Sequence, residues 1–139
     1  MSIELNNATV LVVGAGIMGT GIAQVAAQAG HSVLLFDMRE GAAAEAKDQL
    51  AASLNALVAK GKLGADAVAQ TLARIAAITT LQEAASAGLV VEAIVEKLEA
   101  KRSLFRTLEG VVAADCILAT NTSSISVTAI ANGLQRPAR

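Results

Sequence analysis

Short apolar runs alternate along the chain with longer segments whose apolar residues recur at helical spacing. Continuous β-branched or leucine-rich runs of about four to eight residues are typical of strands that are buried on both faces of a sheet. Runs of this kind predict strands at residues 9–13, 32–37, 75–79, 89–93 and 117–120.

The segments between these runs predict helices. An Ala-rich segment over residues 17–29 ends at Gly30, the residue type that most often follows a helix. A longer segment over about residues 40–60 is rich in Ala, Glu, Lys and Leu and stops at Gly61. Shorter helical segments are expected at 66–74, 81–86, 97–113 and from about residue 127.

Alternating strands and helices indicate an α/β fold. The expected architecture is a doubly wound parallel sheet of the Rossmann type, with a long helical insertion after the second strand. Ligands of such sheets bind at the carboxyl ends of the strands. The residues to examine for function are therefore those that follow each strand, at 14–19, 37, 93–96 and 121–124.

Composition narrows the function classes. The chain has 139 residues, which fits one domain, and its 11 Lys+Arg against 12 Asp+Glu give a net charge of −1. This balance argues against a nucleic-acid partner and against a polybasic membrane surface. Polar residues interrupt every stretch of about 20 residues that a membrane helix would need, and the amino terminus lacks the basic start of a signal peptide. We expect no membrane partner and a cytoplasmic location.

The chain has one cysteine, Cys116, and one histidine, His31. A disulfide framework or a Cys/His metal cluster cannot be built from single residues, so no metal site is expected. Cys116 precedes a buried strand and is expected to pack in the core. His31 follows a helix-ending glycine on the side of the sheet opposite the expected site, and we assign it no catalytic role.

A glycine motif follows the first predicted strand. The run Gly14-Ala15-Gly16-Ile17-Met18-Gly19 matches G-x-G-x-x-G between a strand and a helix. Gly14 would allow the tight turn, Gly16 would let the backbone approach a pyrophosphate, and Gly19 would bring helix and strand together. Unpaired amides and a partial positive charge at the helix start would attract the phosphates.

Asp37 ends the second predicted strand, 18 residues after Gly19. A carboxylate at this place can accept hydrogen bonds from both ribose hydroxyls of adenosine, which favours a dinucleotide site. It should repel a 2′-phosphate, so NAD is expected rather than NADP, although nearby Arg39 is the residue type that accommodates that phosphate. The alternative is that Asp37 caps the helix that starts near Glu40.

Three segments together resemble the 3-hydroxyacyl-CoA dehydrogenase family, including its 3-hydroxybutyryl-CoA and phenylacetate-pathway members. They are Gly14 to Ala23, Leu89-Val90-Val91-Glu92-Ala93-Ile94-Val95-Glu96 with Lys101 following, and Ala119-Thr120-Asn121-Thr122-Ser123-Ser124. The resemblance covers essentially the whole chain. It implies an NAD-dependent oxidation of (S)-3-hydroxyacyl-CoA to 3-oxoacyl-CoA in the full-length enzyme, in fatty-acid or phenylacetate catabolism.

The resemblance also implies roles for single residues. Gly14 to Gly19 would hold the pyrophosphate and Asp37 the adenine ribose, while Glu96 and Lys101 would reach the nicotinamide-side ribose. Ser123 would lie where the nicotinamide meets the acyl-CoA, as the catalytic position of this chain. Read without the family, Glu96 is a helix N-terminal charge, Lys101 a solvated partner, and Ser123 a turn or capping residue.

The acyl-CoA substrate is expected to contact the long second helix. The family likeness places CoA contacts at Ser53 and Lys60, which are seven residues apart and so share one helix face. Lys60 would be available for the phosphates of the adenosine end. The alternative is a solvated lysine in the last helical turn before Gly61.

The family's catalytic histidine lies in a His-Phe-Phe-Asn-Pro segment soon after a sequence like Arg136-Pro137-Ala138-Arg139. We therefore expect residues 1–139 to be the NAD-binding domain, cut before that base, without the helical domain that supplies substrate walls and a homodimer interface. Such a chain would bind NAD(H) with negligible turnover. The alternatives are a stand-alone NAD-binding or regulatory module and, less favoured by residues 121–124, a methyltransferase.

Overall fold

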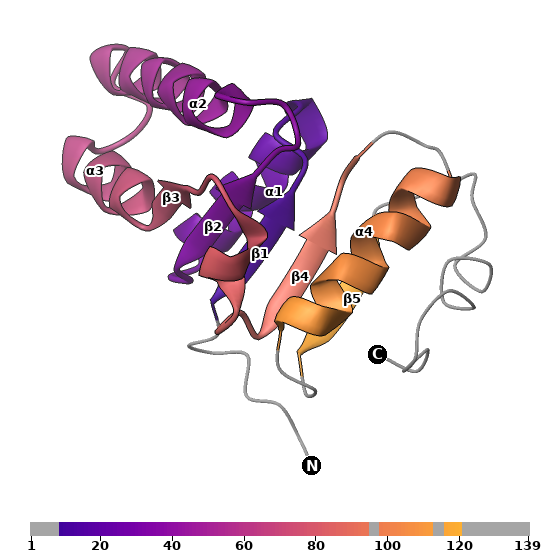
Figure 1. Ribbon diagram of the computed structural model, residues 1–139. Coiled ribbons are helices and arrows are strands. Elements are labelled where there is room, and N and C mark those ends of the chain that lie inside the picture. The colour runs from indigo at the N-terminus through magenta and orange to yellow at the C-terminus, as the bar shows by residue number, and fades with distance from the viewer. Residues whose placement is uncertain (1–8, 95–97, 113–115, 121–139) are drawn as a thin grey trace.

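The computed structural model describes residues 9–94, 98–112 and 116–120. Its strands are β1 (Val10–Val13), β2 (Val33–Phe36), β3 (Ile75–Ala77), β4 (Leu89–Glu92) and β5 (Ile117–Thr120). All pairings are parallel, in the order β3-β2-β1-β4-β5 (Figure 1). The strands expected from the sequence are confirmed, with β3 ending before the predicted limit.

The helices are α1 (Ile17–Gln28), α2 (Ala42–Ala59), α3 (Ala65–Ala73), the 3₁₀ helix η1 (Leu81–Ala84) and α4 (Leu98–Val111). The predicted start of α2 near residue 40 is two residues early. Gly41 has φ of +77°, a left-handed conformation that cannot belong to the helix, and it therefore precedes α2. The helix expected from about residue 127 lies outside the described residues.

Each face of the sheet carries its own core. Along β1, Val10 and Val12 pack against α1, α2 and α3, while Leu11 and Val13 pack against η1 and α4. All four side chains are 3% exposed or less, as expected for a strand covered on both sides. Figure 1 shows α4 lying along β4 and β5, with the other helices gathered around β1 to β3. The doubly wound arrangement is confirmed.

The order of the strands reverses at β1. The chain runs from β1 to β2 and β3 on one side and then returns to pair β4 with the other edge of β1. Val13 is level with Phe36 on β2 and with Glu92 on β4. The residues that follow these three strands therefore meet at one edge, which is where such sheets bind ligands.

The two singleton residues lie away from this edge. Cys116 is buried in the core beneath α4, as the sequence predicted. His31 is half-buried between α1 and the amino end of β2. Among the described residues, no group of His, Cys, Asp and Glu could hold a metal ion, and no described helix is long and apolar enough to cross a membrane.

Gly19 in α1 packs directly against Gly14, the first residue of the turn after β1. A Cβ atom at this position would overlap the carbonyl oxygen of Gly14. We expect Gly19→Ala to destabilise the chain by about 1–3 kcal/mol, the usual range for overpacking at a close contact. Urea unfolding followed by circular dichroism measures this change.

Gly21 provides a matched control, because it lies on the same helix and a Cβ added there would meet nothing within 4 Å. Gly21→Ala should leave stability unchanged or raise it by about 0.5–1 kcal/mol through helix propensity. Equal losses for the two variants would contradict the assigned role of Gly19.

Candidate dinucleotide-binding site

The turn after β1 needs glycine at its first position. Gly14 has φ of +111°, a left-handed conformation that favours glycine, and its amide donates to the carbonyl of Phe36 at 2.7 Å. A Cβ on Gly14 would lie 2.5 Å from the carbonyl oxygen of Ala93, which follows β4. The absence of a side chain therefore lets the ends of β1, β2 and β4 come together.

Neither the backbone conformation nor the packing of the described residues requires a glycine at position 16. Its backbone is extended, with φ of −77° and ψ of −168°, which any residue can adopt. A Cβ at Gly16 would meet nothing within 4 Å. A ligand that passes directly over this backbone would explain the glycine, because a side chain here would fill the ligand's space.

The start of α1 suits an anion. Gly16 is the residue before its first turn, and that turn contains no acidic residue. A helix start of this kind presents backbone N–H donors and a partial positive charge. The turn and helix start thus fit a pyrophosphate.

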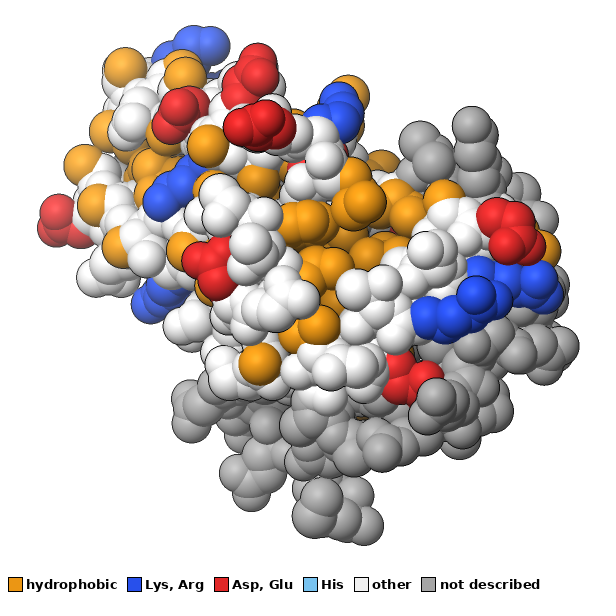
Figure 2. All heavy atoms as spheres, in the orientation of Figure 1, with side chains coloured by type: hydrophobic (Ala, Val, Ile, Leu, Met, Phe, Trp, Pro, Cys, Tyr) orange, Lys and Arg blue, Asp and Glu red, His pale blue; other side chains and the backbone are white. Residues whose placement is uncertain are grey.

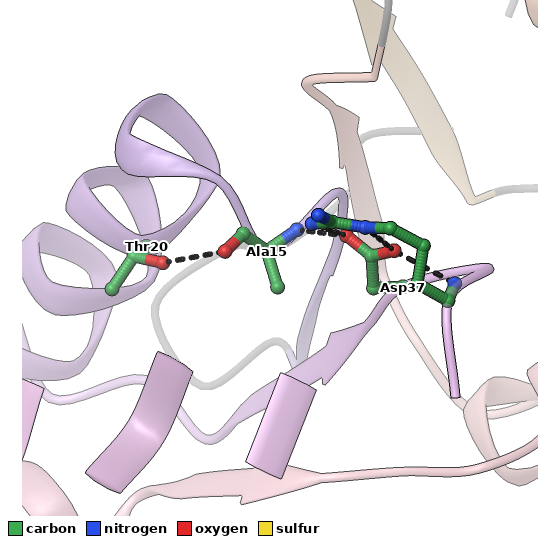
Figure 3. A network of polar contacts seen from close by, with 4 residues as sticks. Ala15, Thr20 and Asp37 are labelled. Carbon is green, nitrogen blue, oxygen red and sulfur yellow. Dashed lines mark hydrogen bonds and ion pairs between the residues drawn. The ribbon is translucent and has the colours of Figure 1, made fainter. Parts of the chain in front are cut away.

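Asp37 follows β2 and faces the turn. Its Oδ2 accepts a hydrogen bond from the amide of Ala15 at 2.8 Å, and its Oδ1 accepts one from the amide of Arg39 at 2.9 Å (Figure 3). Partial burial would raise the pKa of Asp37, but the hydrogen bonds from the Arg39 side chain and from these two amides outweigh it and lower the pKa to about 2. The carboxylate is therefore ionised at neutral pH.

The structure decides one expectation for this region and bears on a second. The helix-cap alternative for Asp37 is wrong, because α2 begins at Ala42 with Gly41 before it. The Ala15 amide, expected among the cofactor contacts, is directed at Asp37 in the structure. Ile17 and Met18 are 94% and 61% exposed, but their apolar side chains have no hydrogen-bond donor, so any polar contact they make with a pyrophosphate would come from their backbone.

A cavity of about 600 Å³ lies beside this carboxylate, between the strand ends and α4. Asp37, Arg39, Ser103 and Thr107 contribute the polar side chains of its lining. Most of the remaining lining is apolar and includes Leu81, Ile94 and Leu104. Figure 2 shows a hollow with hydrophobic side chains at its floor in this part of the molecule. An apolar slot next to an ionised acid suits a flat heteroaromatic ring that carries a polar substituent.

A second groove, of about 540 Å³, runs between α1 and α2. It begins at Gly16 and Thr20 and reaches Ser53 on α2. Lys60 is exposed where α2 ends, beyond the residues that line the groove. A continuous groove thus connects the glycine turn after β1 to Ser53 but does not extend to Lys60.

Glu92 and Lys101 form an ion pair in the interior. The Lys101 Nζ lies 2.8 Å from Glu92 Oε1, and neither side chain has any exposed area. Glu92 Oε2 also accepts a hydrogen bond from the amide of Ile94 at 3.0 Å. The pair therefore joins the end of β4, and the loop that follows it, to the first turns of α4.

This geometry bears on the expected roles. The interpretation of Lys101 as a solvated residue is wrong, because the side chain is fully buried. Its contact with a cofactor ribose stays a prediction, as do the roles of Glu96 and Ser123, which lie outside the described residues. Sequence reasoning assigned Glu92 no role. Its signal was a carboxylate inside an otherwise apolar strand, where an acid needs a partner.

The fold and the site define a dinucleotide-binding domain. It is a parallel sheet with a glycine turn, a helix start and an acid at the switch point, the edge where the order of the strands reverses. The family model for the NAD-binding domain of 3-hydroxyacyl-CoA dehydrogenase matches residues 9–139. The chain belongs to this family, and its cofactor is NAD.

Relatives agree with this assignment. The 3-hydroxyadipyl-CoA dehydrogenase of Escherichia coli is 47% identical over 135 residues, covering 97% of this chain and 28% of the relative. The human mitochondrial hydroxyacyl-coenzyme A dehydrogenase is 43% identical, covering 94% of this chain and 43% of the relative. The chain thus spans well under two thirds of these relatives.

Solved structures give the same picture. The crystal structure of an Escherichia coli 3-hydroxybutyryl-CoA dehydrogenase has a TM-score of 0.91 and 47% identity, covering 96% of this chain and 28% of that chain. The (S)-3-hydroxybutyryl-CoA dehydrogenase of Ralstonia eutropha has a TM-score of 0.88 and 37% identity, covering 94% of this chain and 46% of that chain.

Breaking the buried ion pair should be costly. Glu92→Gln removes the carboxylate charge that lies 2.8 Å from the buried Lys101 ammonium, and we expect a loss of about 3–5 kcal/mol in unfolding free energy. The double variant Glu92→Leu with Lys101→Met removes both charges and should recover a large part of that loss. Urea unfolding measures each value.

The exposed pair between Arg102 and Glu99 on α4 supplies the control, since Glu99 is 81% exposed. Glu99→Gln should change the unfolding free energy by less than about 1 kcal/mol. If Glu92→Gln costs no more than Glu99→Gln, the buried pair does not hold β4 and α4 together.

Proposed function

We propose that this chain is the NAD-binding part of an enzyme that oxidises (S)-3-hydroxyacyl-CoA to 3-oxoacyl-CoA. The observation that carries the proposal is Gly16, a glycine that the protein's own packing does not require, beside the ionised Asp37 at the switch point of the sheet. Family membership supports the substrate class. NAD supplies the hydride acceptor of this oxidation when it is bound.

The residues present fit the cofactor in three places. The start of α1 would hold the pyrophosphate, with Gly16 beneath it, and the Asp37 carboxylate would accept from the adenine ribose. The apolar cavity beside α4 would take the adenine ring. The family resemblance further assigns Glu96 and Lys101 to the nicotinamide ribose, a contact for which the buried Lys101 ammonium would have to become accessible, and Ser123 to both nicotinamide and acyl-CoA.

The chain's own histidine does not suit proton transfer. His31 lies before β2, at the amino end of the strand, whereas the site lies at the carboxyl end. Moving a proton requires a group within hydrogen-bond reach of the substrate hydroxyl. We therefore propose that the 139-residue chain binds NAD(H) with negligible turnover of its own.

The acyl-CoA would contact α2 through Ser53 and Lys60. The groove from the glycine turn supports the contact at Ser53, and relatives named as hydroxyacyl-CoA dehydrogenases support the substrate class. The proposed context is fatty-acid or phenylacetate catabolism in the cytoplasm, by a homodimer of the full-length enzyme.

NADH binding tests the cofactor site. Gly16→Ala should weaken NADH binding by about tenfold or more, because the added methyl group lies where the pyrophosphate crosses the turn. Its unfolding free energy should not fall, since the methyl meets no protein atom within 4 Å. Fluorescence titration with NADH gives the affinities, with Gly21→Ala as the control that should bind as the unaltered chain does. Unaltered NADH affinity in Gly16→Ala would contradict the placement of the pyrophosphate.

Charge reversal on α2 tests the CoA contact. Lys60→Glu should weaken acetoacetyl-CoA binding severalfold while NADH affinity stays the same, because only the CoA phosphates would approach this end of α2. Lys62→Glu makes the same charge change two residues further on, at another exposed position, and should have the smaller effect. Calorimetric titration with acetoacetyl-CoA measures both. Equal effects of the two reversals would leave only a general charge effect and remove Lys60 from the site.

A further inference from the structure

Arg39 lies between the two cavities of the site and lines both of them. Its side chain is 72% exposed, and its guanidinium contacts Asp37, whose side chain is only 10% exposed. The Nε atom lies 3.0 Å from Oδ1 and the Nη2 atom lies 3.1 Å from Oδ2, which is a forked, two-point contact.

These contacts and the backbone hydrogen bonds occupy the acceptor positions of the Asp37 carboxylate. An ionised carboxylate offers about four acceptor positions on its two oxygens. Oδ1 accepts from the amide and the Nε of Arg39, and Oδ2 accepts from the amide of Ala15 and the Nη2 of Arg39. The two backbone donors are fixed by the fold. A ribose diol can therefore be accepted only where the guanidinium gives up its place.

The guanidinium is able to move. The Arg39 side chain is 72% exposed, so water screens its ion pair from one side, and open space borders it on both sides. Glu45 lines the groove between α1 and α2 and attracts the guanidinium in addition to Asp37. Once displaced, the guanidinium remains next to the ribose position with its charge unpaired by Asp37.

The positive charge of Arg39 also affects how the site binds a 2′-phosphate. Asp37 alone would repel a 2′-phosphate on the adenine ribose, but the Arg39 charge offsets that repulsion. A guanidinium also binds phosphate oxygens in a two-point contact. Arg39 thus weakens the binding of NAD(H), whose ribose needs the free Asp37 carboxylate. It strengthens the binding of NADP(H), which carries the additional phosphate.

We propose that Arg39 is a specificity-determining residue, which competes with the adenine ribose of NAD for the Asp37 carboxylate and so narrows the preference for NADH over NADPH. The inference rests on the proposed binding of the adenine ribose by Asp37. It assigns to this chain a weaker discrimination between the two cofactors than the acid alone would give.

Titration of the 139-residue chain with NADH and NADPH tests this inference. Arg39→Ala should tighten NADH binding by up to about fivefold, the equivalent of one exposed ion pair, and weaken NADPH binding by about tenfold or more. The ratio of the NADPH to the NADH dissociation constant should rise by at least about tenfold. Arg39→Lys, which keeps the charge but not the fork, should give an intermediate ratio.

Lys62→Ala removes one positive charge at an exposed position that lines neither cavity, and its ratio should match that of the unaltered chain. An unchanged ratio in Arg39→Ala, or an equal loss of both cofactors, would overturn the role of Arg39. Failure of the unaltered chain to bind NADH would instead overturn the proposed function, and this inference with it. The two failures are thus distinguishable in one set of titrations.

Discussion

The hydrogen bond from the Ala15 amide to the Asp37 carboxylate is the contact on which the geometry of the site depends. It joins the turn after β1 to the end of β2 at 2.8 Å, directly beyond the bond between the Gly14 amide and the Phe36 carbonyl at 2.7 Å. Together they extend the parallel pairing of the two strands past their ends. The turn and the acid are therefore held as one unit, with the carboxylate ionised and oriented before any ligand arrives.

The other side of the switch point is fixed by a different interaction. The buried pair of Glu92 and Lys101 holds the end of β4 against α4, and the amide of Ile94 is tied to the same carboxylate. Gly14 connects the two sides, because its missing side chain allows close approach to Ala93. The cavity between the turn and α4 is lined by Gly14, Asp37 and Ile94, which these contacts hold in place, so its walls depend on polar interactions at the ends of three strands.

The sequence predicted the features that depend on local pattern. Strand positions followed from short apolar runs, and the place of Asp37 followed from its position immediately after one of them. Partners distant in sequence could not be predicted in the same way. The pairing of Glu92 with Lys101 depends on how α4 packs, and Leu81 reaches the cavity from a segment far from the glycine motif. The fork of Arg39 on Asp37 was missed because side-chain direction after a strand end is not set by spacing.

An acid at the end of the second strand is usually taken as the sign of an NAD site. The acid alone does not determine how strongly the site favours NAD, because a carboxylate has a limited number of acceptor positions. In this chain the fold fills two of them with backbone amides and a neighbouring arginine fills the others. The strength of the preference must therefore depend on how readily that arginine leaves. A residue two positions beyond the acid is consequently part of the specificity of the site, although it lies outside the glycine motif itself.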